Sequence, residues 1–420
     1  MIQKISTVGV ILLWATTVAA QTSREERLNR FPIIEPARLM VEQILVPQGD
    51  LKNAAVIDVM KRIPRHRFVP PVHQPAAYWD QALSIGHAQT ISPPYIVAYM
   101  TEQVDPKPTD KILEIGTGSG YQAAVLSLLV DQVYTIEIVE PLGKQAEELL
   151  KQLGMDNVHV RIGDGYKGWS EAAPFDSIIA TCSPESVPQP LIEQLKEGGR
   201  MIIPVGERYQ QVFYLGKKVK GKLELERQMP TLFVPMTGEA EEKRTIKPDP
   251  ENPVLVNGHF QEIEKDGTPA HWHYARNVTV LKGEQGKPNV ARFVRQRPDR
   301  TAEMPDLGFS QMLQGFAIDG QKVPVLHIEY WIRGKGITAL QGPVMTPSAS
   351  LALFDEDRNQ IDEIPQGRCT GTFDWRHISS NVRIRPETRG AVLLIGLPVA
   401  SGQIDIRDVS IKPLSSSPQH

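Results

Sequence analysis

Cysteine is nearly absent from this chain, since Cys182 and Cys369 are the only two among 420 residues. Two thiols are too few for a disulfide scaffold or for a zinc site made of cysteines. The two residues fall in regions that we interpret as different domains, and we do not expect a disulfide between them.

An excess of charge of one sign is also lacking. The chain has 46 lysines and arginines against 49 aspartates and glutamates, a formal net charge of −3. Proteins that bind nucleic acid usually carry a basic surface. The composition therefore gives no support for nucleic acid as a partner.

Near the N-terminus there is an apolar run, Val8 to Trp14, but it is too short to cross a bilayer. Lys4 precedes it, and the small residues Val18-Ala19-Ala20 follow it before Gln21. This order is typical of a cleaved secretory signal peptide. We expect residues 1–20 to be removed and the mature protein to be exported, periplasmic or secreted, without stable membrane insertion. An uncleaved anchor or a buried helix is the alternative.

The most informative stretch runs from Lys111 to Gln122. Ile112 to Ile115 predict a buried strand, glycines follow at alternate positions, and Tyr121 to Val130 have an apolar helical pattern. A strand, a tight glycine turn and a helix open the nucleotide-binding unit of α/β domains. Glycine is needed where the backbone turns sharply and a ligand approaches it closely. The three glycines are Gly116, Gly118 and Gly120.

The spacing of these glycines distinguishes a site for a dinucleotide from a site for S-adenosyl-L-methionine. Dinucleotide sites usually show G-x-G-x-x-G, whereas this chain has G-x-G-x-G preceded by Glu114. A carboxylate there would repel a pyrophosphate but suits the cationic methionine part of S-adenosyl-L-methionine. The pattern therefore favours S-adenosyl-L-methionine over NAD, with Glu114, Gly116, Gly118 and Gly120 as cofactor-binding residues. A glycine-rich turn that binds nothing is the alternative.

Two further acids follow strands. Glu137 lies in a second predicted strand, Val133 to Ile138, where a carboxylate can accept the ribose hydroxyls. Asp164 lies in Gly163-Asp164-Gly165 after a third strand. Ligands of parallel α/β sheets bind beyond the carboxyl ends of the strands. Gly116, Glu137 and Asp164 are therefore expected to meet at one site.

Strands and helices alternate beyond the glycine turn, which predicts a Rossmann-like α/β domain with a mostly parallel sheet. We assign residues 21–240 to this domain and expect them to fold and function alone. The predicted elements are a helical region at 24–62, helices at 140–153 and 187–195, strands at 158–162, 175–180 and 201–205, and an antiparallel pair at 211–215 and 223–227.

Several segments between Arg24 and Gly238 match a known family: 65–70, 77–80, 89–93, 112–120, 163–165, 193–206 and 233–236. Through them this region resembles the protein-L-isoaspartate O-methyltransferase family. The glycine motif occurs in many methyltransferases, but Gln89-Thr90-Ile91-Ser92 is much more specific. Ala88, where the family commonly has glycine, and Pro94 after the serine depart from the pattern without removing a functional group.

The resemblance implies methyl transfer from S-adenosyl-L-methionine to the free α-carboxyl of L-isoaspartyl residues in damaged proteins or peptides. The ester would then cyclise to a succinimide, which starts repair. By resemblance Ser92 is the active-site serine, and Thr90, Ile91 and Ser92 line the substrate cleft. Glu137 would hold the ribose, and Asp164 beside Gly165 the adenine amine.

This chemistry needs orientation rather than a base, because the acceptor carboxylate is ionised at neutral pH. The Ser92 hydroxyl and the amides of a helix start could hold that carboxylate. Ser92 before Pro93 is also the pattern of a simple helix N-cap, which needs no function.

After Pro235 the character of the sequence changes. Residues 241–253 are charged and proline-rich and predict a linker, and 415–420 a flexible tail. Alternating apolar residues in 254–414 predict an antiparallel β-sandwich. Asn257 to Phe260 and Asp266 to Trp272 give it a loose resemblance to galactose-binding-like or carbohydrate-binding jelly rolls.

Three features of the predicted sandwich have both a functional and a structural interpretation. Tryptophans at 272, 331 and 375 either stack on a carbohydrate ligand or fill the core. His271 and His273 lack a third metal ligand nearby, and no metal site is assigned. Residues 355–357 form either a solvated turn or a structural calcium site.

Three functions remain to be compared. The leading one is an exported isoaspartyl methyltransferase with an appended β-sandwich. The second is a methyltransferase of the same fold that acts on another carboxylate or a small molecule. The third is an exported binding protein without activity, since S-adenosyl-L-methionine is a cytoplasmic cofactor. Ser92, Glu137 and Asp164 are all intact, which argues against the third.

Overall fold

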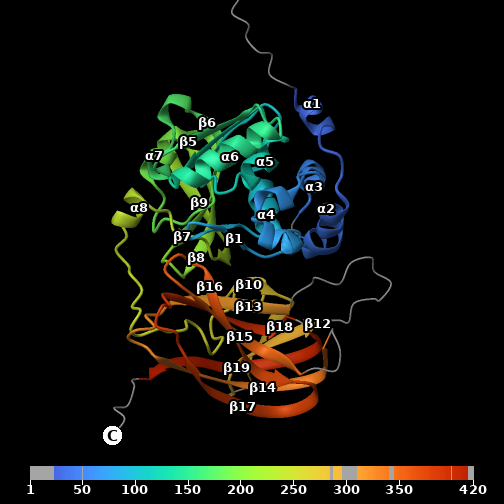
Figure 1. Ribbon diagram of the computed structural model, residues 1–420, viewed down its shortest axis with the longest axis vertical. Coiled ribbons are helices and arrows are strands. Elements are labelled where there is room, and N and C mark those ends of the chain that lie inside the picture. The colour runs from blue at the N-terminus through green and yellow to red at the C-terminus, as the bar shows by residue number, and fades with distance from the viewer. Residues whose placement is uncertain are drawn as a thin grey trace, which may run out of the picture.

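The computed structural model describes residues 23–49, 51–283, 287–295, 310–339, 345–398 and 400–414. The predicted signal peptide (1–20) and the predicted tail (415–420) lie outside the described residues. The chain forms an α/β domain and, below it in Figure 1, a β-sandwich of antiparallel strands. The predicted fold class is confirmed.

A seven-stranded sheet forms the centre of the α/β domain, in the order β5-β4-β3-β6-β7-β8-β9. Neighbours from β5 to β7 pair in parallel, and β8 and β9 close the sheet as antiparallel strands, as the sequence predicts. The strands are β3 (Lys111–Ile115), β4 (Gln132–Glu137), β5 (Val158–Ile162), β6 (Phe175–Ala180), β7 (Leu195–Gly206), β8 (Gln211–Val219) and β9 (Lys222–Thr231).

Apolar clusters cover both faces of this sheet. Ile112 packs into one cluster and its neighbour Leu113 into the other, because successive side chains of a strand point to opposite faces. The α-helices are α1 (Arg24–Asn29), α2 (Glu35–Met40), α3 (Ala54–Met60), α4 (Pro94–Val104), α5 (Tyr121–Ser127), α6 (Glu140–Gln152), α7 (Gln189–Gln194) and α8 (Glu239–Glu242), and a hairpin of β1 (Leu83–Gly86) and β2 (Gln89–Ile91) precedes α4. The helical region expected at 24–62 is thus broken into short helices.

One strand begins earlier than the sequence predicts. β7 starts at Leu195 rather than Met201, so Gly198 and Gly199 lie inside it. The register of β6 against β7 shifts in this part, which marks a bulge. A Cβ at Gly199 would lie 2.7 Å from the carbonyl oxygen of Asp176. Gly199 therefore allows a close approach of backbones, and Gly198 adopts a φ of 79° that favours glycine; neither forms a turn before the strand.

The β-sandwich consists of two five-stranded sheets, β10-β13-β18-β15-β16 and β11-β12-β19-β14-β17, around one apolar core. In β14, Tyr330 and Ile332 are buried in this core, so Trp331 between them faces outward. The strands are β10 (His273–Arg276), β11 (Val278–Leu281), β12 (Val290–Arg295), β13 (Ser310–Ala317), β14 (Val325–Ala339), β15 (Thr346–Phe354), β16 (Gln360–Cys369), β17 (Gly371–Arg383), β18 (Gly390–Leu397) and β19 (Ala400–Leu414).

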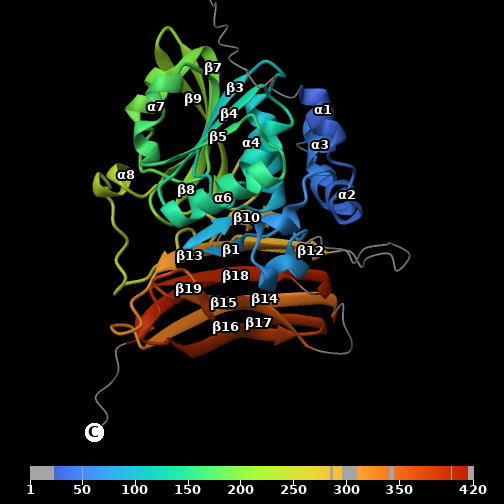
Figure 2. The same cartoon turned by 45° about the horizontal axis from the view of Figure 1, so that its top comes forward.

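The segment expected to be a linker, 241–253, begins with residues packed on the α/β domain. Arg244 is only 4% exposed and donates hydrogen bonds to the carbonyl oxygens of Ser183 and Gly206. Beyond it the chain passes into the sandwich, whose strands β10 and β13 lie nearest the α/β domain in Figures 1 and 2. The two parts therefore share a packed boundary.

Candidate active site

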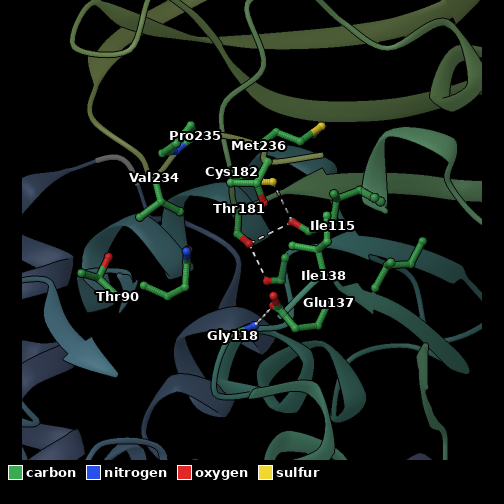
Figure 3. A pocket seen from close by; sticks show the side chains of 15 residues that line it. Thr90, Ile115, Gly118, Glu137, Ile138, Thr181, Cys182, Val234, Pro235 and Met236 are labelled. Atoms are coloured by element: carbon green, nitrogen blue, oxygen red, sulfur yellow. Dashed lines mark hydrogen bonds between the residues drawn. The ribbon is translucent and has the colours of Figure 1, made fainter. Parts of the chain in front are cut away.

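A pocket opens at the carboxyl ends of β3, β4 and β6, where the sequence predicts it (Figure 3). The glycine turn, the end of β4 and Gly165 form one part of its wall. Gln89 and Thr90 of β2 line it from another side, and residues 234–237 complete it. Of the predicted site residues, those that line the pocket are Thr90, Gly116, Gly118, Glu137 and Gly165.

The glycine turn shapes the pocket in two ways. Gly116 has a φ of 95°, and a Cβ there would lie 2.5 Å from the Thr181 hydroxyl. Gly118 lines the pocket with a φ of 54°. Gly120, in contrast, does not line the pocket; a Cβ on it would meet Leu150 of α6. Gly120 therefore allows close packing of the turn on α6, and its contact with the cofactor stays a prediction.

Glu137 is the acid best placed in the pocket. It is 4% exposed, and its carboxylate accepts the backbone N–H groups of Gly118 at 2.7 Å and Val139 at 2.9 Å. Burial raises the pKa of Glu137, against the opposing effect of these hydrogen bonds. Each oxygen has further lone pairs, so the carboxylate can still accept two hydroxyls from a ligand.

Glu114 is not among the residues that line the pocket. It is completely buried, and neither carboxyl oxygen has a partner of good hydrogen-bond geometry among the described residues. Burial raises the pKa of Glu114 to about 8, and the Thr135 hydroxyl opposes this only partly. The predicted contact with the cofactor stays a prediction, although an unpaired buried carboxyl suits a cationic ligand nearby.

Asp164 occupies the start of a short turn after β5. Its Oδ1 accepts the N–H of Tyr166 at 2.9 Å, and its Oδ2 accepts the N–H of Glu239 in α8, also at 2.9 Å. The carboxylate thereby ties α8 to the edge of the pocket without being part of its lining. Gly165 does line it, and a Cβ there would lie 2.4 Å from Ile115.

The proposed substrate residues come from the hairpin before α4. Thr90 faces the pocket from the side opposite Glu137 in Figure 3, whereas Ile91 is 5% exposed and belongs to the apolar core. Ser92 is half-buried, and its carbonyl oxygen accepts a hydrogen bond from Arg65 at 2.7 Å. Ala88, at the hairpin tip, has a φ of 56°, which explains why glycine suits this position better.

The prediction that Ser92 caps a helix is wrong. α4 begins at Pro94, its N-cap residue is Pro93, and no side chain caps it. The amides expected to help hold a carboxylate are also missing, because prolines have no N–H and the Tyr95 N–H donates to Asp80 Oδ1 at 2.9 Å. The Ser92 hydroxyl has no partner among the described hydrogen bonds, so it is free for a ligand.

Two parts of the wall were not predicted. Thr181, directly after β6, donates its hydroxyl to the carbonyl oxygen of Gly116 at 2.6 Å, and Cys182 lies beside it. Residues 234–237 are held there because the Ser183 N–H donates to the Val234 oxygen and the Met236 N–H to the Ser183 oxygen. The position of Thr181 directly after the strand at 175–180 could have identified it from the sequence. Residues 233–236 entered the sequence analysis only as a segment that matches the family.

The sandwich candidates have structural partners. Trp272 is 1% exposed and donates its indole N–H to the carbonyl oxygen of Asn257, so it belongs to the core. His273 lies 3.0 Å from the Tyr209 oxygen, and burial lowers its pKa to about 4. His271 contacts Gln210 and Glu262. No cluster of three potential metal-binding side chains occurs within the described ranges.

Residues 355–357 form a turn, and no ligand is needed to explain its hydrogen bonds. Asp355 accepts the N–H and the side-chain amide of Asn359, as expected for a turn. Cys182 and Cys369 are both buried and free. In the part of the chain that the structure covers, no helix has the length and apolar character of a membrane span.

Comparison with known proteins agrees with this geometry. A family model described as protein-L-isoaspartate(D-aspartate) O-methyltransferase matches residues 38–241. The protein-L-isoaspartate O-methyltransferase of Opitutus terrae is 55% identical over 201 residues, which are 48% of this chain and 86% of that protein. The enzyme of the same name from Gloeobacter violaceus is 50% identical over 201 residues, 48% of this chain and 98% of that protein.

Solved structures give related matches. A protein-L-isoaspartate O-methyltransferase has a TM-score of 0.45 at 28% identity, over 53% of this chain and 75% of that one. A Plasmodium falciparum protein assigned to the same family, in complex with S-adenosyl-L-homocysteine, has a TM-score of 0.43 at 25% identity, over 48% of this chain and 98% of that one. On the sequence matches, this chain belongs to the protein-L-isoaspartate (D-aspartate) O-methyltransferase family.

Proposed function

We propose that this chain methylates the free α-carboxyl of L-isoaspartyl residues in damaged proteins or peptides and so initiates their repair. One observation carries the proposal: the glycine turn, Glu137 and Thr90 of the Gln89–Ser92 segment meet in one pocket of a chain that belongs to this family. Methyl transfer to isoaspartyl residues is the activity for which the relatives are named.

The cofactor is S-adenosyl-L-methionine, which the family uses. The pocket fits it, because Gly116 and Gly118 leave room that side chains would fill and Glu137 has lone pairs for ribose hydroxyls. When bound, this cofactor supplies a methyl group on a cationic sulfur. We assign Glu137 to the ribose and Asp164, through the loop of Gly165, to the adenine end.

The acceptor carboxylate is already ionised at neutral pH, so the protein has to orient it rather than remove a proton. Orientation of this kind contributes several kcal/mol to lowering a barrier, about 7–11 kcal/mol at its most effective. We assign this task to Ser92 and Thr90. Ser92 suits it because its hydroxyl is uncommitted while its backbone is held by Arg65.

The experiment is methyl transfer to paired peptides that differ only in an isoaspartyl or an aspartyl linkage. Labelling of the isoaspartyl peptide alone supports the proposal. Equal labelling of both would favour a methyltransferase for another carboxylate. Absence of both labelling and S-adenosyl-L-homocysteine binding would favour a binding protein without activity.

We also propose that the protein is exported after cleavage before Gln21. Lys4, the apolar run Val8 to Trp14 and the small residues 18–20 support this location. Sequencing of the N-terminus of the protein purified from its host is the test. Gln21 as the first residue is expected, and an intact Met1 in a cytoplasmic fraction would contradict export.

We further propose that the β-sandwich is a jelly roll of the galactose-binding-like kind and binds carbohydrate on the outer face of β14, β17 and β19. Trp331 and Trp375 are both half-buried there, and the Arg407 guanidinium lies 5.4 and 4.6 Å from their ring centroids. Asp405 beside them pairs with Arg292 at 2.8 Å. Aromatic rings with fixed polar groups next to them are suited to sugar rings.

Glycan arrays probed with the full chain test this proposal. Trp331→Ala and Trp375→Ala should each abolish any binding found, whereas Trp79→Ala, which changes a 43% exposed tryptophan of the α/β domain, should not. Absence of binding by the unchanged chain, or equal binding by all variants, would contradict the assignment of this face.

A further inference from the structure

Strand β10 of the sandwich lies on the side that faces the α/β domain (Figures 1 and 2) and contacts β9 of that domain. The Tyr274 hydroxyl donates to the carbonyl oxygen of Leu232 at 2.9 Å. Arg276, two residues further on, forms an ion pair with Asp80 of the α/β domain. These contacts join the sandwich to the chain just before the wall segment 234–237 and to Asp80, which is hydrogen-bonded to Tyr95 at the start of α4.

Asp80 is the residue that Arg276 neutralises. The Asp80 side chain is 0% exposed; its Oδ1 accepts the Tyr95 N–H at 2.9 Å, and its Oδ2 faces the Arg276 guanidinium. Arg276 itself is only 14% exposed, and its guanidinium carbon lies 5.4 Å from the centroid of the Tyr95 ring. The ion pair is therefore largely removed from water.

Arg65 is the other buried cation in this region; its charge also acts on Asp80 at longer range, but its hydrogen bonds go to other partners. It donates to the carbonyl oxygens of Ala77 at 2.8 Å and Ser92 at 2.7 Å, and it lies over the Tyr121 ring. Among the ion pairs of the described residues, the partner of Asp80 is Arg276. A residue of the sandwich thus supplies the counter-charge for a carboxylate of the α/β domain.

Ser92 stands between two fixed points. Arg65 holds the carbonyl of Ser92, and Asp80 holds the N–H of Tyr95 three residues later. Pro93 and Pro94 connect them, and proline has a fixed φ that makes this connection stiff. A displacement of Asp80 would therefore move Tyr95 and, through the two prolines, also Ser92.

We propose that Arg276 is a positioning residue for methyl transfer: from the sandwich it neutralises Asp80, which anchors Tyr95 and thereby fixes Ser92. The inference rests on the proposed function of Ser92. Without the Arg276 guanidinium the buried carboxylate keeps only the Tyr95 N–H and the longer-range charge of Arg65, which is unfavourable, so Asp80 must shift toward water or toward Arg65. Either change weakens the anchor at Tyr95.

The cofactor side of the pocket is supported by a separate contact. The oxygen that Tyr274 holds belongs to Leu232, just before the wall segment 234–237. Glu137 and the glycine turn are tied to each other through Gly118. A change at Arg276 should therefore affect use of the acceptor peptide far more than binding of the cofactor.

The test uses the full chain with Arg276→Met, Asp80→Asn, both changes together, and Arg227→Met as a matched control. Arg227 also pairs across the boundary, with Glu264, but is 45% exposed. Arg276→Met should lower kcat/KM for an isoaspartyl peptide about 10- to 100-fold, as small displacements of a reacting group do. The dissociation constant of S-adenosyl-L-homocysteine should change less than about twofold, since the cofactor contacts lie elsewhere.

The double variant gives the sharpest result. The amide oxygen introduced by Asp80→Asn would still accept the Tyr95 N–H and needs no cation, so the double variant should return to within about threefold of the unchanged chain. Arg227→Met should stay within about twofold, because exposed pairs contribute little. Three results would overturn the inference: an unchanged kcat/KM in Arg276→Met, an equally large loss in Arg227→Met, or a kcat/KM of the double variant no higher than that of Arg276→Met.

Hydrogen exchange of the backbone amides in residues 92–97 tests the hydrogen bond between Asp80 and the Tyr95 N–H independently of activity. Exchange of the Tyr95 amide should be faster in Arg276→Met and normal again in the double variant; unchanged exchange would overturn the inference. If Arg276→Met does not fold, the double variant decides, because it must fold and protect this amide. A chain that transfers no methyl group to isoaspartyl peptides would refute the proposed function, while exchange still tests the role of Arg276.

Discussion

The carboxylate of Glu137 accepts the backbone N–H of Gly118 at 2.7 Å, so the acid that ends β4 and the glycine turn that follows β3 form one continuous wall. A shift of either residue alone would break this hydrogen bond. The cofactor side of the pocket is therefore already in place before a ligand arrives, which reduces the cost of ordering it on binding.

Glu137→Ala should weaken binding of S-adenosyl-L-homocysteine by about 1–3 kcal/mol, because charge-assisted hydrogen bonds to the ribose are lost. Isothermal titration calorimetry measures this directly. Glu140→Ala is the control, since Glu140 is an exposed acid on α6 paired with Lys144. Equal affinities of the Glu137 variant and the unchanged protein would remove Glu137 from the site.

Glu114 predicts how stability depends on pH. Its pKa is raised from 4.5 to about 8 in the folded protein, so between these values the folded chain keeps a proton that the unfolded chain releases. The free energy of unfolding of the cofactor-free protein should therefore fall as pH rises from 5 to 8, by up to about 1.4 kcal/mol per pH unit.

Glu114→Gln should flatten this dependence, because glutamine does not titrate. A smaller slope of the same sign should remain from Glu137, whose pKa burial also raises. Urea unfolding at pH 5, 6, 7 and 8 compares the two proteins. Parallel curves for both would show that Glu114 is not the group responsible.

Ser92→Ala should reduce methyl transfer to an isoaspartyl peptide by one to two orders of magnitude, about 1.4–2.7 kcal/mol of barrier. Stability should change by less than about 0.5 kcal/mol, because the hydroxyl caps no helix. Ser186→Ala, at an exposed serine, is the control. Full activity of the Ser92 variant would exclude its assigned role.

A chain of residues 21–240 should fold, because relatives consist almost entirely of the matched region. It should transfer methyl groups more slowly than the full chain, because Asp80 loses Arg276, and Asp80→Asn should restore most of the rate. This changes the expectation from the sequence alone, in which the shorter chain was fully functional. Equal rates for both lengths would support that earlier expectation instead.

Local patterns predicted the cofactor side well. Gly116, Gly118 and Glu137 could be placed because strand ends and glycine spacing determine each of them within a short stretch. Ser92 was assigned through resemblance, and its interpretation as a cap failed because Pro93 and Pro94 shift the helix start. Spacing in a sequence does not reveal such a shift of one residue.

Long-range packing could not be predicted. The partner of Asp80 is an arginine in another domain, and neither residue has a local pattern that points to the other. The bulge at Gly198 and Gly199 likewise depends on the neighbouring strand β6. Trp272, directly before β10, is a core residue because the fold packs it beside Phe260, which a single tryptophan in a sequence cannot indicate.

The central claim is tested most directly by labelled methyl transfer from S-adenosyl-L-methionine by the full chain to two matched peptides. One contains an isoaspartyl residue and the other an aspartyl residue at the same position. The pocket lined by Thr90 and Glu137, with Ser92 beside Thr90 in the chain, predicts transfer to the isoaspartyl peptide alone, with a loss of one to two orders of magnitude in Ser92→Ala. Equal transfer to both peptides, or transfer to neither, would contradict the account.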